Sequence, residues 1–134
     1  MGALGERAAA RYLRKKGYRL TAVNFTCRFG EIDLIAEKNG FLVFVEVKTR
    51  TEDTPYAPRE AVGPAKQRRI ILTAELYLSG CRTPLQPRFD VVEVVLQKGN
   101  PNKVVRIEPV SYTHLDVYKR QGQSRPSCPM SLKL

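Results

Sequence analysis

The chain has 134 residues, of which 43% are hydrophobic and 27% are charged. This length fits one domain with one core and excludes a multidomain enzyme, and the composition is that of a folded globular protein. Lysine and arginine outnumber aspartate and glutamate by 23 to 13, and the resulting net charge of +10 favours a polyanionic partner such as nucleic acid, although such charge can also serve solubility alone.

Cysteine and histidine usage narrows the chemistry. The three cysteines are widely separated and odd in number, which suits neither a zinc site nor a disulfide framework and fits a reducing, cytoplasmic location. No apolar run approaches the roughly 18 to 20 residues of a membrane span, so we expect no membrane partner. His114 is the only histidine, so acid–base chemistry is expected from carboxylates, lysine or a metal ion.

The first predicted element is a helix over residues 3–16, with Gly17 placed where a C-cap glycine belongs. Helical projection groups the basic side chains in one sector and puts Glu6 in the other, beside small apolar residues. A carboxylate on the apolar side is costly unless it is paired or bound to a cation. In the first turn of a helix it can instead complement the dipole and stay hydrated, and both interpretations of Glu6 remain open.

A hairpin follows the helix. Three strands are expected, over residues 20–25, 31–37 and 41–48. Between the last two lies Asn39-Gly40, the strongest short signal for a two-residue type I′ turn. This turn fixes the register, so that Ile35 lies opposite Phe44. One face of the hairpin then carries only apolar residues, namely Ile32, Leu34, Ala36, Val43, Val45 and Val47.

The second half of the domain adds one helix and two strands. They are expected over residues 64–79, 89–96 and 104–108, after a polar connection over residues 49–63. The helix stops at Gly80, and the first of these strands is almost uninterruptedly apolar, which is typical of an interior strand. A strand–helix–strand connection implies that it runs parallel to the strand before the helix. The order αβββαββ predicts an α/β fold with a mixed central sheet flanked by helices.

The C-terminal segment differs from the rest. Residues 111–134 show neither helical nor strand periodicity, and the piece SYTHLDVYKRQ looks like translated adaptor or vector sequence. We therefore expect one domain over residues 1–110, followed by an irregular tail that is foreign to it or disordered. His114 and Cys128 lie in this tail and take no part in the predicted fold. The surplus of basic residues persists without it.

The hairpin register also places Asp33 opposite Glu46, and like charges that face each other across antiparallel strands are destabilising. A divalent cation between the two carboxylates would offset the repulsion, and oxygen-only ligands favour Mg²⁺ or Mn²⁺ over zinc or copper. Lys48 lies on the same face, roughly 6.5 to 7 Å along the strand from Glu46, close enough to position or activate a water at the metal. The pattern predicts a site for metal-assisted hydrolysis.

A plainer interpretation gives these residues no catalytic role. Glu31, which the register places opposite Lys48, would form an exposed ion pair with it, and Asp33 and Glu46 would be solvated at the end of the sheet. A single Glu-x-Lys tripeptide is common and fits that view. The facing aspartate together with the inward Glu6 is a much rarer coincidence and favours the catalytic interpretation.

The same residues resemble a known group of proteins. Asp33 followed by Glu46-Val47-Lys48 on a hairpin is similar to the pattern of the PD-(D/E)XK nuclease superfamily, with its restriction-endonuclease-like core. More closely, the segments GERAAARYLRKKGY, NFTCRFGEIDLIA, VFVEVKTR and RFDVVEV resemble the bacterial YraN family of endonuclease-like proteins, which are similar to archaeal Holliday-junction resolvases. The resemblance covers about residues 2–110.

The resemblance assigns roles to individual positions. It implies that Asp33 and Glu46 bind metal, that the carbonyl of Val47 can join them, and that Lys48 supports the attacking water. Glu6 is implied as a further acidic residue of the site. The one departure lies before the aspartate, where Ile32 stands in place of the usual proline.

Basic residues near the site are candidate phosphate contacts. Arg50 directly follows the site strand, whereas Lys66, Arg68 and Arg69 lie in the first turns of the second helix. Lys66 aligns with the buried stripe of that helix and is the stronger candidate, because Arg68 and Arg69 can equally be solvated.

The leading hypothesis is thus a Mg²⁺- or Mn²⁺-dependent endonuclease that acts on DNA, including branched or structured DNA. One alternative is a module that binds nucleic acid on the same fold without turnover. The other is an assembly protein that forms a homodimer through an apolar sheet edge.

Overall fold

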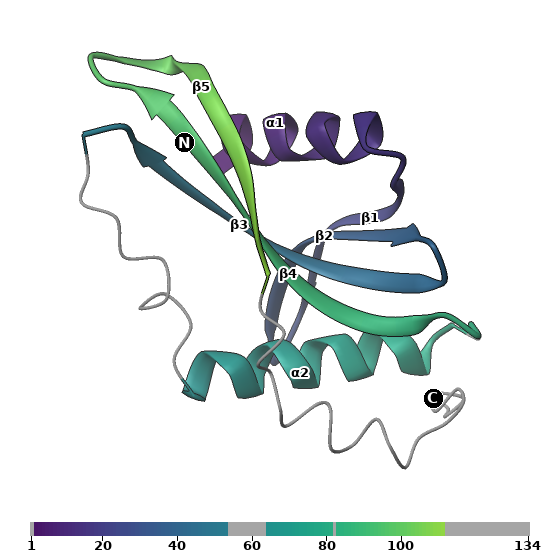
Figure 1. The fold of residues 1–134 in the computed structure, drawn as a ribbon. Helices are drawn as coiled ribbons and strands as arrows, with labels where there is room; N and C mark the ends of the chain where they lie inside the picture. Colours follow the sequence, from purple (N-terminus) through teal and green to yellow (C-terminus); the bar gives the residue numbers. More distant parts are fainter. Residues whose placement is uncertain (1, 54–63, 82, 112–134) are drawn as a thin grey trace.

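The computed structural model describes residues 2–53, 64–81 and 83–111. Within them, two helices and five strands follow one another in the predicted order (Figure 1). They are α1 (Gly2–Lys15), β1 (Arg19–Cys27), β2 (Gly30–Lys38), β3 (Phe41–Thr51), α2 (Pro64–Ser79), β4 (Gln86–Gln97) and β5 (Asn100–Ser111). Every strand extends beyond its predicted bounds. The predicted tail beyond Ser111, and the connection over residues 54–63, lie outside the described residues.

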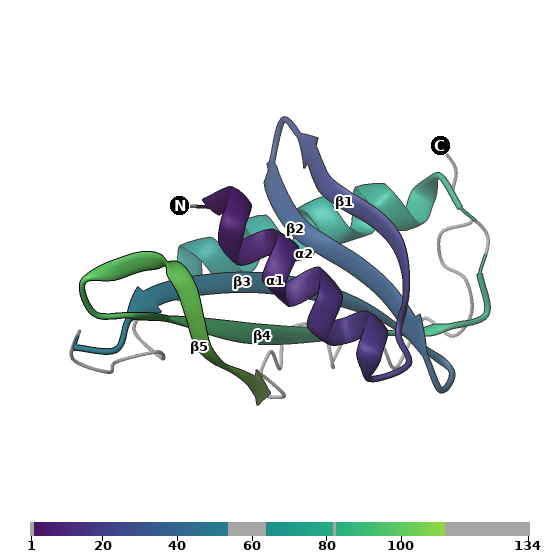
Figure 2. The same cartoon turned by 90° about the horizontal axis from the view of Figure 1, so that it is seen from above.

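The strands of the described residues form one mixed sheet in the order β1-β2-β3-β4-β5. β3 and β4 run parallel, as predicted for strands joined through a helix, and the other neighbours are antiparallel. α1 covers one face of the sheet and α2 covers the other (Figures 1 and 2). This confirms the predicted α/β fold class and agrees with a restriction-endonuclease-like core. Neither of these helices is long and apolar enough to cross a membrane.

The end of α1 shows how local sequence sets the fold. Gly17 has a φ of 95°, a left-handed conformation that glycine adopts without steric cost. The N–H of Tyr18 donates to the carbonyl of Leu13 at 3.0 Å, and that of Gly17 donates to Arg14 at 3.0 Å, which together form a Schellman motif. The predicted C-cap is confirmed.

The β2–β3 turn is also formed as predicted. Asn39 and Gly40 both have positive φ, at 51° and 85°, as a type I′ turn requires. Ile35 pairs with Phe44, which confirms the register.

The β2–β3 ladder is shorter than predicted. It ends at Leu34 and Val45, so the pairs expected next, Asp33 with Glu46 and Glu31 with Lys48, are not part of it. The physical reason is a hydrogen bond between a backbone N–H and a side chain. At this point the backbone N–H of Val47 donates to Asp33 Oδ2 at 2.8 Å, and the two strands part.

Two apolar clusters lie on the two faces of the sheet. Toward α2 the buried residues are Ile32, Ile35, Leu42, Phe44, Ile71, Ala74, Leu78 and Phe89. Toward α1 they are Ala9, Ala10, Leu13, Leu34, Val43, Val45, Val92, Val94 and Leu96. The predicted placement of Ile32 on the face of Leu34 is therefore wrong. Alternation breaks between them at Asp33, opposite which Asn24 of β1 has a φ of 54°.

Candidate functional site

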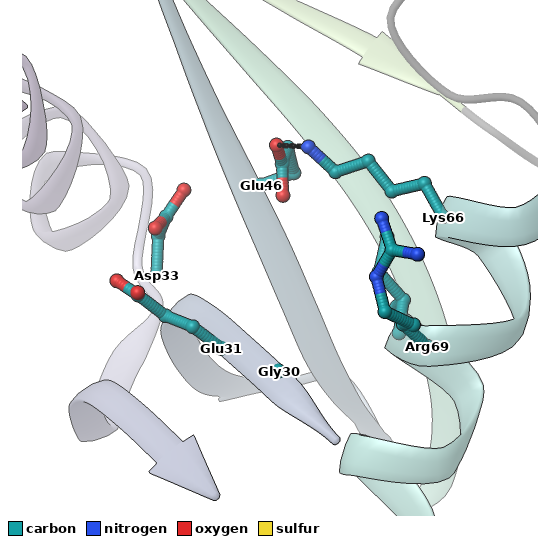
Figure 3. Close-up of a pocket in the computed structure, with 7 residues that line it drawn as sticks. Gly30, Glu31, Asp33, Glu46, Lys66 and Arg69 are labelled. Carbon is teal, nitrogen blue, oxygen red and sulfur yellow. Dashed lines mark hydrogen bonds and ion pairs between the residues drawn. The ribbon is translucent and has the colours of Figure 1, made fainter. Parts of the chain in front are cut away.

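A pocket of about 250 Å³ opens where β2 and β3 part, and α2 forms its far wall. Its lining residues are Gly30, Glu31, Asp33, Glu46, Lys66, Arg69 and Ile70. Figure 3 shows Glu31 and Asp33 on one side, Lys66 and Arg69 on the other, and Glu46 between them. Acidic side chains of β2 thus face basic side chains of α2 across one opening.

The surroundings of Asp33 in this pocket disfavour the ionised form of its carboxyl. Burial raises the pKa of its carboxyl from 3.8 to about 6, in spite of the hydrogen bond from Val47, which acts in the opposite direction. The negative charges of Glu46, Glu6 and Glu31 contribute to this rise after burial. Near neutral pH the carboxylate is therefore ionised at an energetic cost, which is the condition that favours binding of a positive ion.

Three carboxylates gather at this wall. One oxygen each of Glu6, Glu31 and Asp33 lie within 4.8 Å of one another, with Glu31 exposed and the other two half-buried. The structure therefore brings Glu6 to Asp33, as the sequence predicted for a common site. The sequence did not predict Glu31 as a member of this carboxylate cluster, because the predicted hairpin register paired it with Lys48. The signal was present, because Glu31 stands two residues before Asp33 on the same strand.

Glycine at position 5 allows Glu6 to reach this cluster. Gly5 is buried, and a Cβ atom added to it would collide with Oγ1 of Thr49 on β3. The first turn of α1 therefore approaches β3 more closely than any larger residue would permit. The next residue of the helix, Glu6, lies beside the acidic end of β2 as a result.

Glu46 is held by lysines rather than by the other acids. Lys66 Nζ lies 2.7 Å and Lys48 Nζ 3.3 Å from the same oxygen, Oε2, of this side chain, which is only 15% exposed. Burial alone would lower the pKa of Lys66, but its hydrogen bond with Glu46 and the charge of Glu46 outweigh burial and raise it. Asp33 and Glu46 do share a pocket, as expected. In this structure, however, two ammonium groups neutralise Glu46.

A buried ion pair lies next to Lys48, which pairs with Glu93 in the register of β3 and β4. Arg50 Nε contacts Glu93 Oε2 at 3.1 Å, and the two side chains are only 14% and 5% exposed. The other oxygen of Glu93, Oε1, is buried without a hydrogen-bond partner in the described part of the chain. Sequence reasoning missed Glu93, although a lone glutamate in the apolar run VVEVVL signals an unusual buried charge.

The four predicted phosphate contacts differ in position. Lys66 and Arg69 line the pocket, whereas Arg68 is exposed on α2 and is not part of the lining. The guanidinium of Arg50 is committed to Glu93 and to the carbonyl of Thr51 at 3.2 Å. The structure thus brings two of the four together with the acidic residues.

Comparison with known proteins places the chain in a family. Residues 5–94 match the sequence model of the uncharacterised protein family UPF0102. The chain belongs to the UPF0102 family. This confirms the resemblance to YraN proteins, and the matched range of this UPF0102 chain contains every candidate site residue from Glu6 to Glu93.

Individual UPF0102 relatives match most of the chain. The UPF0102 protein of Caldanaerobacter subterraneus is 46% identical over 113 residues, which cover 84% of this chain and 89% of the relative. That of Symbiobacterium thermophilum is 54% identical over 95 residues, covering 70% and 80% respectively. A UPF0102 protein of Syntrophus aciditrophicus is 50% identical over 97 residues, covering 72% and 76%.

Proposed function

We propose that this UPF0102 protein is a metal-dependent endonuclease that hydrolyses phosphodiester bonds in DNA. One observation carries the proposal. Asp33 and Glu46, from neighbouring strands, line the same pocket, and Lys48 contacts Glu46 from two residues along its strand. Carboxylates that converge beside a lysine are suited to hydrolysis of a phosphate ester, because they can hold a divalent cation while the lysine orients water.

The residues present fit Mg²⁺ or Mn²⁺. The donors at the acidic wall are carboxylate oxygens alone, from Glu6, Glu31 and Asp33, and these hard ligands are the ones that both ions prefer. The raised pKa of Asp33 shows that its negative charge is poorly compensated by the chain itself. A divalent cation held there would supply a positive charge that acidifies water and stabilises the developing charge on phosphate.

The side chains across the pocket have complementary roles. Lys66 and Arg69 of α2 offer positive charge to the non-bridging oxygens of a phosphate that enters between α2 and β2. Lys48, 32% exposed beside Glu46, can hold the attacking water in line with the phosphorus atom. As the new bond from water to phosphorus forms, the water gives up a proton to solvent, the bond to the leaving oxygen breaks, and that oxygen takes up a proton from solvent.

The substrate class rests on charge and resemblance. A formal net charge of +10 favours a polyanion, and nonspecific attraction of this kind is expected for DNA. The similarity of the family to Holliday-junction resolvases supports branched DNA as the preferred substrate within that class. We propose the cytoplasm as the place of action, because the cysteine usage suits a reducing compartment.

The test is a cleavage assay on labelled linear, nicked and four-way-junction DNA with Mg²⁺ or Mn²⁺. Asp33→Asn and Lys48→Gln should each abolish product while leaving DNA binding in place. The matched control is Lys103→Gln, which removes one charge from an exposed site on β5. Undiminished cleavage by Asp33→Asn would refute the assignment of the site.

The second candidate is a nucleic-acid-binding module without turnover. The observation in its favour is that Lys48 and Lys66 already neutralise Glu46, so this acid needs no cation for its own stability. Such a protein would bind DNA with strong salt dependence and give no product at any metal concentration. The cleavage assay therefore distinguishes the two functions directly.

A further inference from the structure

One carboxylate oxygen of Glu46 takes two ammonium groups from different elements. Lys48 lies on the same strand as Glu46, whereas Lys66 reaches across the pocket from the first turn of α2 (Figure 3). The Lys66 contact is the shorter, at 2.7 Å against 3.3 Å. A divalent cation at Glu46 would meet repulsion from both ammonium groups, so Glu46 binds such a cation more weakly while both lysines stay.

Of the two lysines at Glu46, Lys66 is the one placed to move away from this carboxylate. The two lysine side chains are similarly exposed, at 34% for Lys66 and 32% for Lys48, but only Lys66 lines the pocket. Its flexible four-carbon stem carries a compact charge that can turn from one oxygen to another. Arg69, one turn further along α2, lines the same wall, so a phosphate in the pocket would attract Lys66 toward Arg69 and away from Glu46.

We propose that Lys66 is a positioning residue that exchanges Glu46 for the phosphate of bound DNA and thereby releases Glu46 toward the divalent cation. This inference rests on the proposed nuclease function. It adds that DNA binds before Glu46 becomes available to the cation. Without DNA, Lys66 occupies Glu46, and within the described residues the acidic wall of Glu6, Glu31 and Asp33 is the cluster open to a cation. With DNA, Glu46, which lies between the acidic wall and α2, becomes available as a further ligand (Figure 3).

The exchange makes two binding events cooperative. If DNA removes Lys66 from Glu46, DNA must increase the affinity for the divalent cation, and by linkage the cation must increase the affinity for DNA by the same factor. The raised pKa of Lys66 keeps its ammonium charged at neutral pH, so a charge moves and no proton is lost. Couplings of this kind amount to about fivefold or more.

The experiment measures Ca²⁺ affinity by titration calorimetry, with and without a four-way DNA junction. Ca²⁺ is used because it takes the same oxygen ligands as Mg²⁺. Wild-type protein should bind Ca²⁺ at least about fivefold more tightly when DNA is present. Lys66→Met should bind Ca²⁺ more tightly than wild type without DNA, and DNA should no longer change that affinity. Lys66→Arg, which keeps the charge, should retain a coupling.

Lys103→Met is the matched control, because it removes the same charge from an exposed position outside the pocket. A change in Ca²⁺ affinity equal to that of Lys66→Met would mean that net charge alone is responsible and would overturn the exchange. Equal Ca²⁺ affinities for wild type and Lys66→Met, both without DNA, would also overturn it while leaving the metal site intact. Failure of both proteins to bind Ca²⁺ would instead refute the proposed metal-dependent function itself.

Discussion

The carboxylate of Asp33 accepts a hydrogen bond from the backbone N–H of Val47 at 2.8 Å. This bond from backbone to side chain takes the place of the next backbone hydrogen bonds between β2 and β3, whose regular pairing ends at Leu34 and Val45. The bond holds Asp33 at the wall of the pocket, while burial and the neighbouring acids make its ionised form costly. The same feature that opens the strands also creates a site suited to a cation.

The first prediction concerns Asp33 without metal. Its pKa is about 6 in the folded chain against 3.8 ordinarily, so the folded state binds the proton more tightly and loses stability as the pH rises from about 4 to 6. Asp33→Asn removes this loss and can still accept the Val47 hydrogen bond. At pH 8 in EDTA, the variant should be more stable than wild type by on the order of 1 kcal/mol after solvent screening.

Urea unfolding at pH 4 and pH 8 measures this difference. The two proteins should become similar in free energy of unfolding near pH 4. At that pH Asp33 is protonated in the folded chain and is becoming protonated in the unfolded chain as well, so the cost of its burial as a charge disappears. A wild type that is more stable than Asp33→Asn at pH 8 would show that the carboxylate is well compensated in the metal-free protein.

The second prediction concerns metal addition. Mn²⁺ should raise the melting temperature at pH 8, because a ligand at 100 times its Kd stabilises the folded state by about 2.7 kcal/mol. The shift should shrink below pH 6, where a proton competes for Asp33. Glu6→Gln and Glu31→Gln should each reduce it, whereas Glu108→Gln on β5 should not. Equal shifts in all three variants would exclude the acidic wall as the binding site.

Local signals made much of the fold predictable. The Asn39-Gly40 turn specified its own conformation and, through it, the register of Ile35 with Phe44. Gly17 marked the end of α1 because only a left-handed residue completes that cap readily. Each of these features depends on residues close together in the chain, where backbone preferences alone decide the outcome.

The site depended on contacts that no local pattern encodes. Extending the register beyond Leu34 predicted a facing pair of Asp33 and Glu46, but the Val47 hydrogen bond ended the ladder first. The contact of Lys66 with Glu46 joins residues 20 positions apart and depends on how α2 docks on the sheet. Periodicity indicated which face of the helix is buried, and it could not identify the partner of one lysine.

The third prediction concerns the buried pair of Arg50 and Glu93. Removing one member leaves the other charge buried without its partner, which typically costs about 3 to 5 kcal/mol. Arg50→Met should therefore lower the free energy of unfolding by about that amount, as measured in urea. The double variant Arg50→Met with Glu93→Leu should recover most of the loss, because it buries no charge. If the double variant is as unstable as Arg50→Met, packing of the arginine stem is responsible instead.

The last prediction tests the close approach of α1 to β3. Alanine in place of a helical glycine normally stabilises by roughly 0.5 to 1 kcal/mol, but at Gly5 the added methyl group would collide with Thr49. Gly5→Ala should therefore destabilise the chain by about 1 to 3 kcal/mol. In a Thr49→Ala background the hydroxyl is gone, and the same change should become neutral or stabilising. Thermal unfolding of the four proteins in this cycle gives the coupling energy between the two positions. A coupling near zero would mean that α1 does not need Gly5 in order to bring Glu6 to the acidic wall.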